Sequence, residues 1–391
     1  MGSNAYYVKP ENLQNLKLQS SISRLIKTKI DFHEYKDAII SIDNLCCFVN
    51  GVVMKNSLFY EHLNTKKAPN KADCKNELSN CIFIGCLAST WGHWITDTLK
   101  KIWYLRTDDY KKKLSQGWLI VYITLNDGGY LSLNHKMSSN QKELLELAGV
   151  DASSWLEITE NTIVHNIVIP DNSLISTKNE GMYYTKEFKE TIHLITDSVP
   201  TISDYEKVYF TRTSFKSIKD FGEEKIEAFF AKMGYRIIAP EKLSVKEQIS
   251  ILKSCNFFAA CESSASHNAI FCQNGTNVAI LRKGDYINNY TLLINQVADL
   301  NVTFIDAHNS EYINKHKPEF GPFFMFVTKH LKAWAGVKQI GLPYWLTKTW
   351  FQYVFFCKHN KTITQTKLYL CLRYPRYLLG HIKQKISKLS I

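Results

Sequence analysis

A histidine and an aspartate four residues apart make the first group in this sequence that could do chemistry. His93 and Asp97 lie in the run GHWITDTLKKIW, which begins at Gly92. The apolar residues of this run share one face at helical spacing, so the two polar side chains are neighbours on the opposite face. A carboxylate beside an imidazole can accept the proton of a hydroxyl nucleophile. The spacing predicts a catalytic pair with Asp97 as base and His93 as its partner. An ordinary ion pair on a solvated helix face is the structural alternative.

Arg212 and Lys216 form a second group, directly after a predicted strand at 207–210. The guanidinium of an arginine offers a planar fork of donors that suits a phosphate. Ligands of open parallel sheets bind beyond the carboxyl ends of the strands, which favours this position. We therefore predict that both side chains contact a phosphate-bearing ligand, with an exposed loop arginine as the alternative.

A third group follows a predicted strand at 256–261 and opens a short helix. Its sequence is ESSASHN, from Glu262 to Asn268, and small hydroxyl residues at a helix start leave backbone N–H groups open. These groups and the helix dipole attract a diphosphate, whereas an ordinary serine cap is the alternative. The predicted ligands in this group are Ser263, Ser264, Ser266, His267 and Asn268.

Strands and helices alternate most clearly between residues 205 and 282. Apolar runs predict strands at 207–210, 235–238, 256–261 and 278–281, and helices at 222–233, 244–254 and 264–272 separate them. Ser244 and Glu247 have the spacing of a capping box at the start of the second helix. This alternation indicates a parallel sheet covered on both faces. The first half is similar but less regular, with strands predicted at 81–85, 118–123 and 163–169 and a helix at 141–148.

The chain is long enough for two domains with cores of their own. We predict an α/β protein of two Rossmann-like halves that face a central cleft, with a basic, aromatic, helical C-terminal tail. The acceptor-side domain spans residues 1–195, the nucleotide-binding domain spans 196–310, and the tail spans 311–391.

Several motifs are missing from the sequence. It has no G-x-x-x-x-G-K-[ST] run and no G-x-G-x-x-G run, which disfavours a P-loop ATPase and a dinucleotide oxidoreductase. No two Asp are separated by one residue, so a D-x-D metal site is absent, and no C-x-x-C pair indicates zinc. We expect no metal, because cationic groups and helix ends would hold a departing diphosphate instead. The ten cysteines are expected to be reduced and mostly buried.

Taken in this order, the motifs resemble glycosyltransferase family 61. The first is the His-x-x-x-Asp run followed by an apolar helix to Leu105. The later ones are Thr211-Arg212 after a strand, Gly234-Tyr235, PEKLS at 240–244 and SSASHNAIF at 263–271. The similarity covers roughly residues 80–300 and is strongest from 207 to 282.

This resemblance implies a two-domain GT-B fold and inverting transfer from a nucleotide sugar without a required metal. It implies that Asp97 is the base and that Arg212 and Ser263 through Asn268 bind the nucleotide diphosphate of a UDP-linked donor. Glu241, in the PEKLS run, is expected to contact the same ligand. Many relatives have His-Gly-Ala where this chain has Glu262-Ser263-Ser264. A carboxylate there would repel a diphosphate unless it turns away or binds the sugar or ribose.

The excess of positive over negative charge comes from the end of the chain. Glu319 is the last acidic residue, and the 12 Lys and Arg that follow it equal the whole net charge of +12. Aromatic residues alternate with these cations over 331–391, a pattern typical of a segment at an anionic bilayer surface. We expect a cytoplasmic enzyme, peripheral on the inner face of the cell membrane, that meets a glycan or lipid-linked glycan acceptor there. No recognition motif accompanies the charge, so nucleic acid is not expected as a partner. The alternative is that part of the tail packs back on the first domain as structural helices.

These observations predict a glycosyltransferase, moving a hexosyl or pentosyl group, of capsule or lipopolysaccharide biosynthesis. Two other functions fit the same residues. One is a different nucleotide-dependent transferase, such as a phosphosugar transferase. The other is an inactive, membrane-associated glycan assembly protein, which the departure at Glu262 leaves open.

Overall fold

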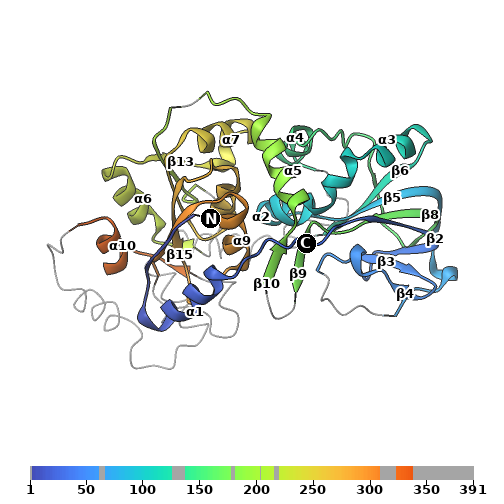
Figure 1. The fold of residues 1–391 in the computed structure, drawn as a ribbon, viewed down its shortest axis with the longest axis horizontal. Helices are drawn as coiled ribbons and strands as arrows, with labels where there is room; N and C mark the ends of the chain where they lie inside the picture. The colour runs from blue at the N-terminus through green and yellow to red at the C-terminus, as the bar shows by residue number, and fades with distance from the viewer. Residues whose placement is uncertain are drawn as a thin grey trace, which may run out of the picture.

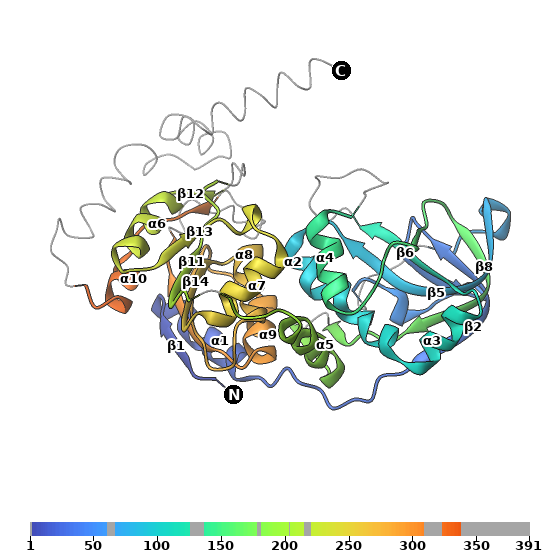
Figure 2. The same cartoon turned by 90° about the horizontal axis from the view of Figure 1, so that it is seen from above.

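Two large β-sheets lie side by side in this protein, with helices packed between and around them (Figure 1, Figure 2). The computed structural model describes residues 2–60, 67–125, 137–177, 181–202, 204–214, 220–308 and 323–337. Lys216 and most of the predicted tail, residues 338–391, therefore lie outside the described residues. The predicted α/β class is confirmed by both sheets.

The second half of the chain builds a six-stranded sheet in which all neighbouring strands are parallel. Its order is β1-β16-β15-β14-β11-β13. The strands are β1 (Asn4–Tyr7), β11 (Lys207–Phe210), β13 (Arg236–Ile238), β14 (Phe257–Cys261), β15 (Asn277–Arg282) and β16 (Asn301–Asp306). The four strands predicted between 207 and 281 are confirmed as β11, β13, β14 and β15.

Helices connect and cover this sheet, as the alternating pattern predicted. They are α1 (Pro10–Ser21), α6 (Glu223–Lys232), α7 (Val245–Ser254), α8 (Ser264–His267), α9 (Asn289–Val297) and α10 (Lys329–Trp334). The capping box at the start of α7 is confirmed: Ser244 Oγ accepts from the Glu247 amide at 3.2 Å, and Glu247 Oε2 accepts from the Ser244 amide at 2.7 Å. A short parallel pair, β12 (Asp220–Phe221) and β17 (Phe323–Phe324), adds to this half.

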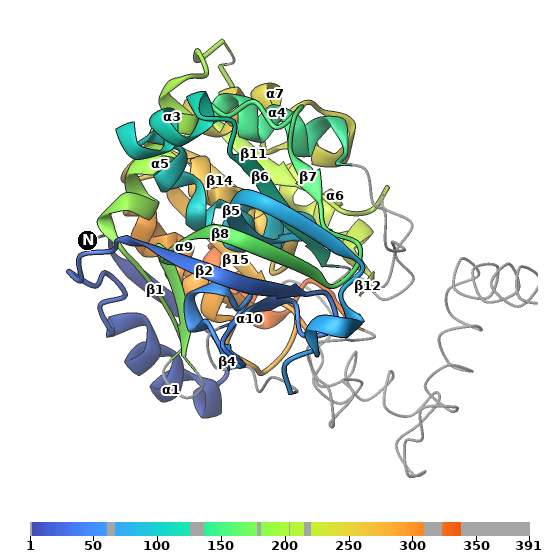
Figure 3. The ribbon, with the colours of Figure 1, turned by 90° about the vertical axis from the view of Figure 1, so that its right-hand side faces the viewer.

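The first half forms a seven-stranded mixed sheet of order β4-β3-β2-β8-β5-β6-β7 (Figure 3). Its strands are β2 (Phe32–Ser41), β3 (Cys46–Val49), β4 (Val52–Val53), β5 (Asn76–Ala88), β6 (Leu119–Leu125), β7 (Leu156–Glu157) and β8 (Thr162–Pro170). Strands β8, β5, β6 and β7 are parallel, whereas β2, β3 and β4 add an antiparallel edge. The prediction of a Rossmann-like first half is therefore only partly right, because the exposed residues of β2 gave no apolar run that sequence reasoning could recognise.

Two further elements lie between the sheets in sequence. The described residues between 171 and 203 contain a hairpin and a helix: β9 (Leu174–Thr177), β10 (Gly181–Tyr184) and α5 (Lys186–Asp197). Helices α3 (Asp108–Ser115) and α4 (Ser139–Leu147) belong to the first half, and α4 confirms the helix predicted at 141–148.

The two halves share one apolar core, although we expected a separate core in each. The largest buried cluster contains Ile82 and Trp94 from the first half and Phe258 and Ile280 from the second. Because side chains alternate along a strand, each sheet also buries its opposite face in a smaller cluster of its own. Polar contacts join the halves as well, since Glu143 Oε2 accepts from the Val245 amide at 2.7 Å.

The ends of the described chain both pack on the six-stranded sheet. Strand β1 pairs with β16, so the chain starts on the far side of the predicted division at residue 195. Helix α10 contacts β1 and β16, and Trp334 lies 5.6 Å from Phe230 of α6 between ring centroids. The first part of the predicted tail thus packs on the protein, but on the six-stranded sheet of the second half and not on the first domain, where the alternative placed it. None of the helices described in the structure has both the length and the apolar character needed to cross a membrane.

Candidate active site

The segment that carries His93 and Asp97 follows the carboxyl end of β5. Gly85 has φ +91 and coincides with a register shift in β5, between Phe83 and Cys86. The segment after the strand is helical, as predicted, but irregular: α2 (Trp91–His93) continues as a π-helical turn, Trp94–Thr98, and then as a 3₁₀-helix, Leu99–Arg106. A π-helical turn widens the backbone and commonly accompanies functional sites.

Asp97 lies inside the protein, so the solvated helix face is the wrong alternative. Its side chain has no exposed area, whereas that of His93 is 28% exposed. His93 Nδ1 lies 2.8 Å from Asp97 Oδ2, and Thr96 Oγ1 donates to the same oxygen at 3.0 Å. The second oxygen, Oδ1, is buried and has no hydrogen-bond partner among the described residues. His93 is thus the member of the pair that faces outward.

Aromatic residues from both halves complete this cluster. Tyr290 of α9 donates to Asp97 Oδ2 at 2.7 Å, and its hydroxyl lies 2.9 Å from that of Tyr60. The Tyr290 ring stands edge-on to His93, with centroids 5.0 Å apart, and lies 5.5 Å from His267. Sequence reasoning missed both tyrosines. The only available signal for Tyr290 was its position in the segment that follows a strand of the parallel sheet.

The charges around the pair keep Asp97 ionised. Burial alone would raise the pKa of Asp97, but the hydrogen bond and charge of His93, the ammonium of Lys100 and the Tyr290 hydroxyl lower it below its ordinary value. Burial and the nearby His93 lower the pKa of His267 to about 4, against the opposing effects of the Gly92 backbone and Asp97. A neutral imidazole and an ionised carboxylate therefore lie in the same cluster near neutral pH.

Lys100 supplies a buried positive charge behind Asp97. Its ammonium donates to the carbonyl of Phe59 and lies 4.9 Å from the centroid of the Phe59 ring. Two residues of the predicted apolar helix are thus cations inside the protein, because Lys101 is also buried and donates to the carbonyls of Asn56 and Pro170. Carbonyl oxygens compensate for the cost of removing these ammonium groups from water.

Those predicted phosphate ligands of the second half that the structure describes lie at the carboxyl edge of the six-stranded sheet. Arg212 follows β11 and is half-buried, and its amide donates to Glu223 Oε1 at 3.1 Å. Glu241 follows β13, is exposed and accepts a hydrogen bond from Ser214. Lys216 cannot be placed with them, since it lies outside the described residues. Because parallel strands end at one edge, this edge is where a ligand would bind.

The serines after β14 use most of their groups within the helix start. Ser263 Oγ accepts from the Ala265 amide at 3.2 Å, and Ser266 Oγ accepts from the Ser263 amide at 3.1 Å. The predicted open N–H groups of Ser263 and Ala265 are therefore capped, as in the ordinary serine cap. Asn268 is occupied too, since its Oδ1 accepts from Trp91 Nε1 at 3.1 Å. Ser263 and Ser264 are the partly exposed hydroxyl residues of this group, and of these two only Ser263 uses its Oγ in the cap.

The first and second halves meet closely at this point. A Cβ at Gly92 would lie 2.7 Å from His267 Nδ1, closer than real Cβ contacts, and 3.0 Å from Ser264 Oγ, tighter than most of them. We predicted the His93–Asp97 pair and the residues after β14 from two separate motifs. The structure brings these two groups together. This geometry is the one expected for a site shared by two halves.

Comparison with known proteins bears on what this site does. The model of the family Glycosyltransferase 61 matches residues 91–279, just under half of the chain. This chain is a glycosyltransferase. Curated proteins gave no match. The matched part of the glycosyltransferase begins directly before His93 and includes Arg212 and the residues after β14, whereas Tyr290 lies beyond it.

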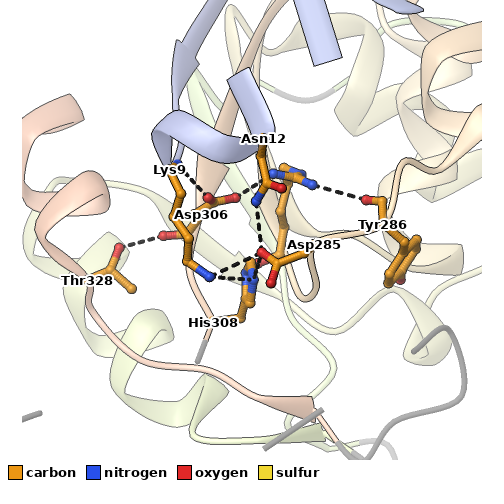
Figure 4. A network of polar contacts seen from close by, with 8 residues as sticks. Lys9, Asn12, Asp285, Tyr286, Asp306, His308 and Thr328 are labelled. Carbon is orange, nitrogen blue, oxygen red and sulfur yellow. Dashed lines mark hydrogen bonds and ion pairs between the residues drawn. The ribbon is translucent and has the colours of Figure 1, made fainter. Parts of the chain in front are cut away.

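The glycosyltransferase also has a network of charges, which sequence reasoning missed, at the carboxyl ends of β15 and β16 (Figure 4). Arg282 Nη1 lies 2.6 Å from Asp306 Oδ1, and both side chains are 1% exposed. Asp306 Oδ2 accepts from the Lys9 amide at 2.7 Å, which ties the start of α1 to the sheet. Asp285 Oδ1 accepts from Lys9 Nζ at 3.1 Å and lies 2.9 Å from His308 Nε2.

Glu262 lies beside this network, at the carboxyl end of β14. The residue is 3% exposed, and its Oε2 has no hydrogen-bond partner among the described residues. Burial raises the pKa of Glu262 to about 7, opposed by Arg282 and Lys283 and assisted by Asp306. A carboxyl group that is partly protonated and flanked by two cations does not present a full negative charge to an anionic ligand.

No three His, Cys, Asp or Glu side chains within the described ranges are grouped closely enough to hold a metal ion. Of the ten cysteines, the eight that the structure describes are free thiols, and all but the partly exposed Cys74 are buried, as expected.

Proposed function

We propose that this glycosyltransferase transfers a sugar, with inversion at the anomeric carbon, from a UDP-linked donor to a hydroxyl group of a glycan acceptor. One observation carries the proposal. A buried, ionised carboxylate orients a partly exposed histidine at the point where the first half meets the carboxyl edge of the parallel sheet. In this view the two halves act as the acceptor and donor sides of a GT-B-type enzyme.

The donor would bind at the carboxyl edge of the six-stranded sheet. Arg212 and Ser264 are partly exposed there and are the residues that we assign to the diphosphate, because Ser263 Oγ is used in the helix cap and Glu241 is acidic. Lys216 completes the proposed set. A guanidinium and a hydroxyl group stabilise the negative charge that develops on a departing diphosphate. We propose that no metal is required, because these groups supply the necessary positive charge and donors.

His93 is the residue that would accept the proton. We first predicted that Asp97 does so, but its side chain has no exposed area and its Oδ2 already accepts several hydrogen bonds. Because Nδ1 of His93 is turned toward Asp97, Nε2 points to the other side of the ring. Asp97 would then hold the ring in place and stabilise the imidazolium that forms when the acceptor hydroxyl loses its proton.

The cellular role belongs to the same proposal. A lipid-linked acceptor would lie at a bilayer surface, and the 12 cations after Glu319 suit an anionic surface of that kind. We therefore propose a peripheral enzyme of capsule or lipopolysaccharide assembly, working on the cytoplasmic face of the membrane.

Substitutions at the pair test the catalytic part. A general base contributes about 10²–10⁴-fold to a rate, so His93→Gln should lower kcat by that factor while the affinity for UDP stays unchanged. Asp97→Asn should also lower kcat, because it removes the negative charge that stabilises the imidazolium. Asp108→Asn is the control, since that carboxylate is fully exposed on α3. Transfer would be followed with a donor panel, and NMR of the product would report the anomeric configuration.

Three results would contradict the proposal. Full activity of His93→Gln, with loss of activity only in Asp97→Asn, would return the role of base to Asp97. Full activity of both variants would remove the pair from the mechanism. Loss of transfer in excess EDTA, restored by a divalent cation, would contradict metal independence.

A further inference from the structure

Tyr290 is the residue of the second half that reaches the catalytic pair of the first. It lies on α9, the element that follows β15 in the chain, and it is 193 residues from Asp97 in sequence. Its hydroxyl donates to Asp97 Oδ2 at 2.7 Å, the same oxygen that lies 2.8 Å from His93 Nδ1. Its ring also packs edge-on against the imidazole. One side chain therefore contacts both members of the pair.

We propose that Tyr290 is a positioning residue: its ring holds His93, and its hydroxyl sets how strongly the His93–Asp97 pair holds a proton. The kinetic part rests on the function proposed above, because it requires His93 to be the proton acceptor. The geometric part does not, since the contacts exist whatever the reaction. The residue lies outside the matched family region, so the family comparison assigns it no role.

The hydroxyl of Tyr290 competes with His93 for the charge of one carboxylate oxygen. While Tyr290 donates, part of the negative charge on Oδ2 is neutralised, and the imidazolium gains less from it. Without the hydroxyl, more of that charge faces Nδ1. The protonated form of His93 is then stabilised, and the ring holds its proton to a higher pH.

Several other groups face the pair and stay in place when the hydroxyl is removed. Thr96 donates to Oδ2, the Lys100 ammonium lowers the pKa of Asp97, and Tyr60 lies 3.5 Å from His93 Nδ1 through its hydroxyl. His267 lies on the other side of the Tyr290 ring, and burial keeps it neutral near pH 7. None of them bridges the carboxylate and the imidazole as Tyr290 does.

Three variants of the chain separate the effect of the Tyr290 hydroxyl from that of other tyrosine hydroxyls. Tyr290→Phe removes only the hydroxyl. Tyr60→Phe removes a hydroxyl that bonds Tyr290 but is not the donor to Asp97, and Tyr110→Phe is a distant control in the first half. Histidine rings labelled with ¹³C would be titrated by NMR, with the His93 signal assigned from its loss in His93→Gln. This readout needs no substrate.

Tyr290→Phe should raise the titration midpoint of His93 by about one pH unit. The free energy of a hydrogen bond to a charged group is comparable to the free energy of a pKa shift of that size. Tyr60→Phe should give a smaller rise, and Tyr110→Phe none. In kcat/KM, the acid limb of Tyr290→Phe should move to higher pH by the same amount. Tyr290→Ala should lower kcat further, because His93 loses the ring that holds it.

The outcomes distinguish this inference from the proposed function. An unchanged or lowered His93 midpoint in Tyr290→Phe, with thermal stability retained, overturns the role of Tyr290. A raised midpoint with no movement of the kcat/KM profile supports the positioning of the pair but overturns His93 as the proton acceptor. If Tyr290→Phe unfolds, the ordered response of Tyr60→Phe and Tyr110→Phe decides, and equal midpoints in both overturn the inference.

Discussion

Replacing Glu262 by glutamine should stabilise the protein, and the gain should grow with pH. Glu262 is buried beside Arg282 and Lys283, and burial raises its pKa from 4.5 to about 7. The folded chain therefore holds this proton more tightly than the unfolded chain. The resulting stabilisation is fully present below pH 4.5 and is lost as the pH rises through about 7. Glutamine resembles the protonated acid in shape and carries no charge at any pH.

The pKa shift gives the size of the effect. One pKa unit corresponds to 1.36 kcal/mol, so the shift of Glu262 from 4.5 to about 7 sets a limit of about 3 kcal/mol. The free energy of unfolding of Glu262→Gln, relative to the parent chain, should rise by up to about this amount between pH 4.5 and pH 8. No reduction for solvent screening is needed, because the residue is only 3% exposed.

Urea unfolding followed by tryptophan fluorescence at pH 5, 6, 7 and 8 would measure this difference. Glu146→Gln is the matched control, because Glu146 is exposed on α4 and its substitution should leave the pH dependence unchanged. A stability difference that stays constant with pH, or that grows toward low pH, would refute the reasoning. It would mean that Arg282 and Lys283 outweigh burial and keep Glu262 ionised in the folded chain.

Two other predictions concern the contact between the halves and the end of the chain. Gly92→Ala should cost about 1–3 kcal/mol of stability and lower transfer, because its Cβ would collide with His267 and Ser264; thermal melts and rate assays would measure both, and an unchanged melting temperature would contradict the tight contact. A chain ending at residue 337, which keeps α10, should float less with anionic liposomes than the full chain, and equal flotation of both would exclude the remaining tail from membrane binding.

The sequence predicted the six-stranded sheet better than the seven-stranded one. Parallel strands such as Phe257–Cys261 are buried on both faces, so they are continuous apolar runs that stand out between helices. Strand β2 has exposed residues over much of its first half and pairs with antiparallel neighbours, so its pattern is weaker. The first strand was missed because its four residues join a sheet whose other members begin some 200 residues later.

For the candidate site, the spacing of nearby residues predicted their contact correctly. Contacts between residues far apart in sequence could not be predicted in this way. Four-residue spacing correctly placed His93 beside Asp97, but nothing in the sequence indicated that the π-helical turn buries the carboxylate. Lys100 would ordinarily be assigned to a solvated face, yet it lies inside and donates to backbone carbonyls. The contact from Tyr290 depends on how two halves pack, which periodicity within either half cannot show.

The residues of this glycosyltransferase that match the family model do not coincide with the residues that form its two large sheets. Residues 91–279 contain β11, β13 and β14 but omit β16 and β1, which form one side of the same parallel sheet. They also omit β5, which pairs with both β6 and β8 in the seven-stranded sheet. The matched residues therefore cannot form either sheet without their flanking segments. Those segments contribute Tyr60 and Tyr290 to the cluster around Asp97, so the candidate site includes residues from parts of the chain that the family model does not match.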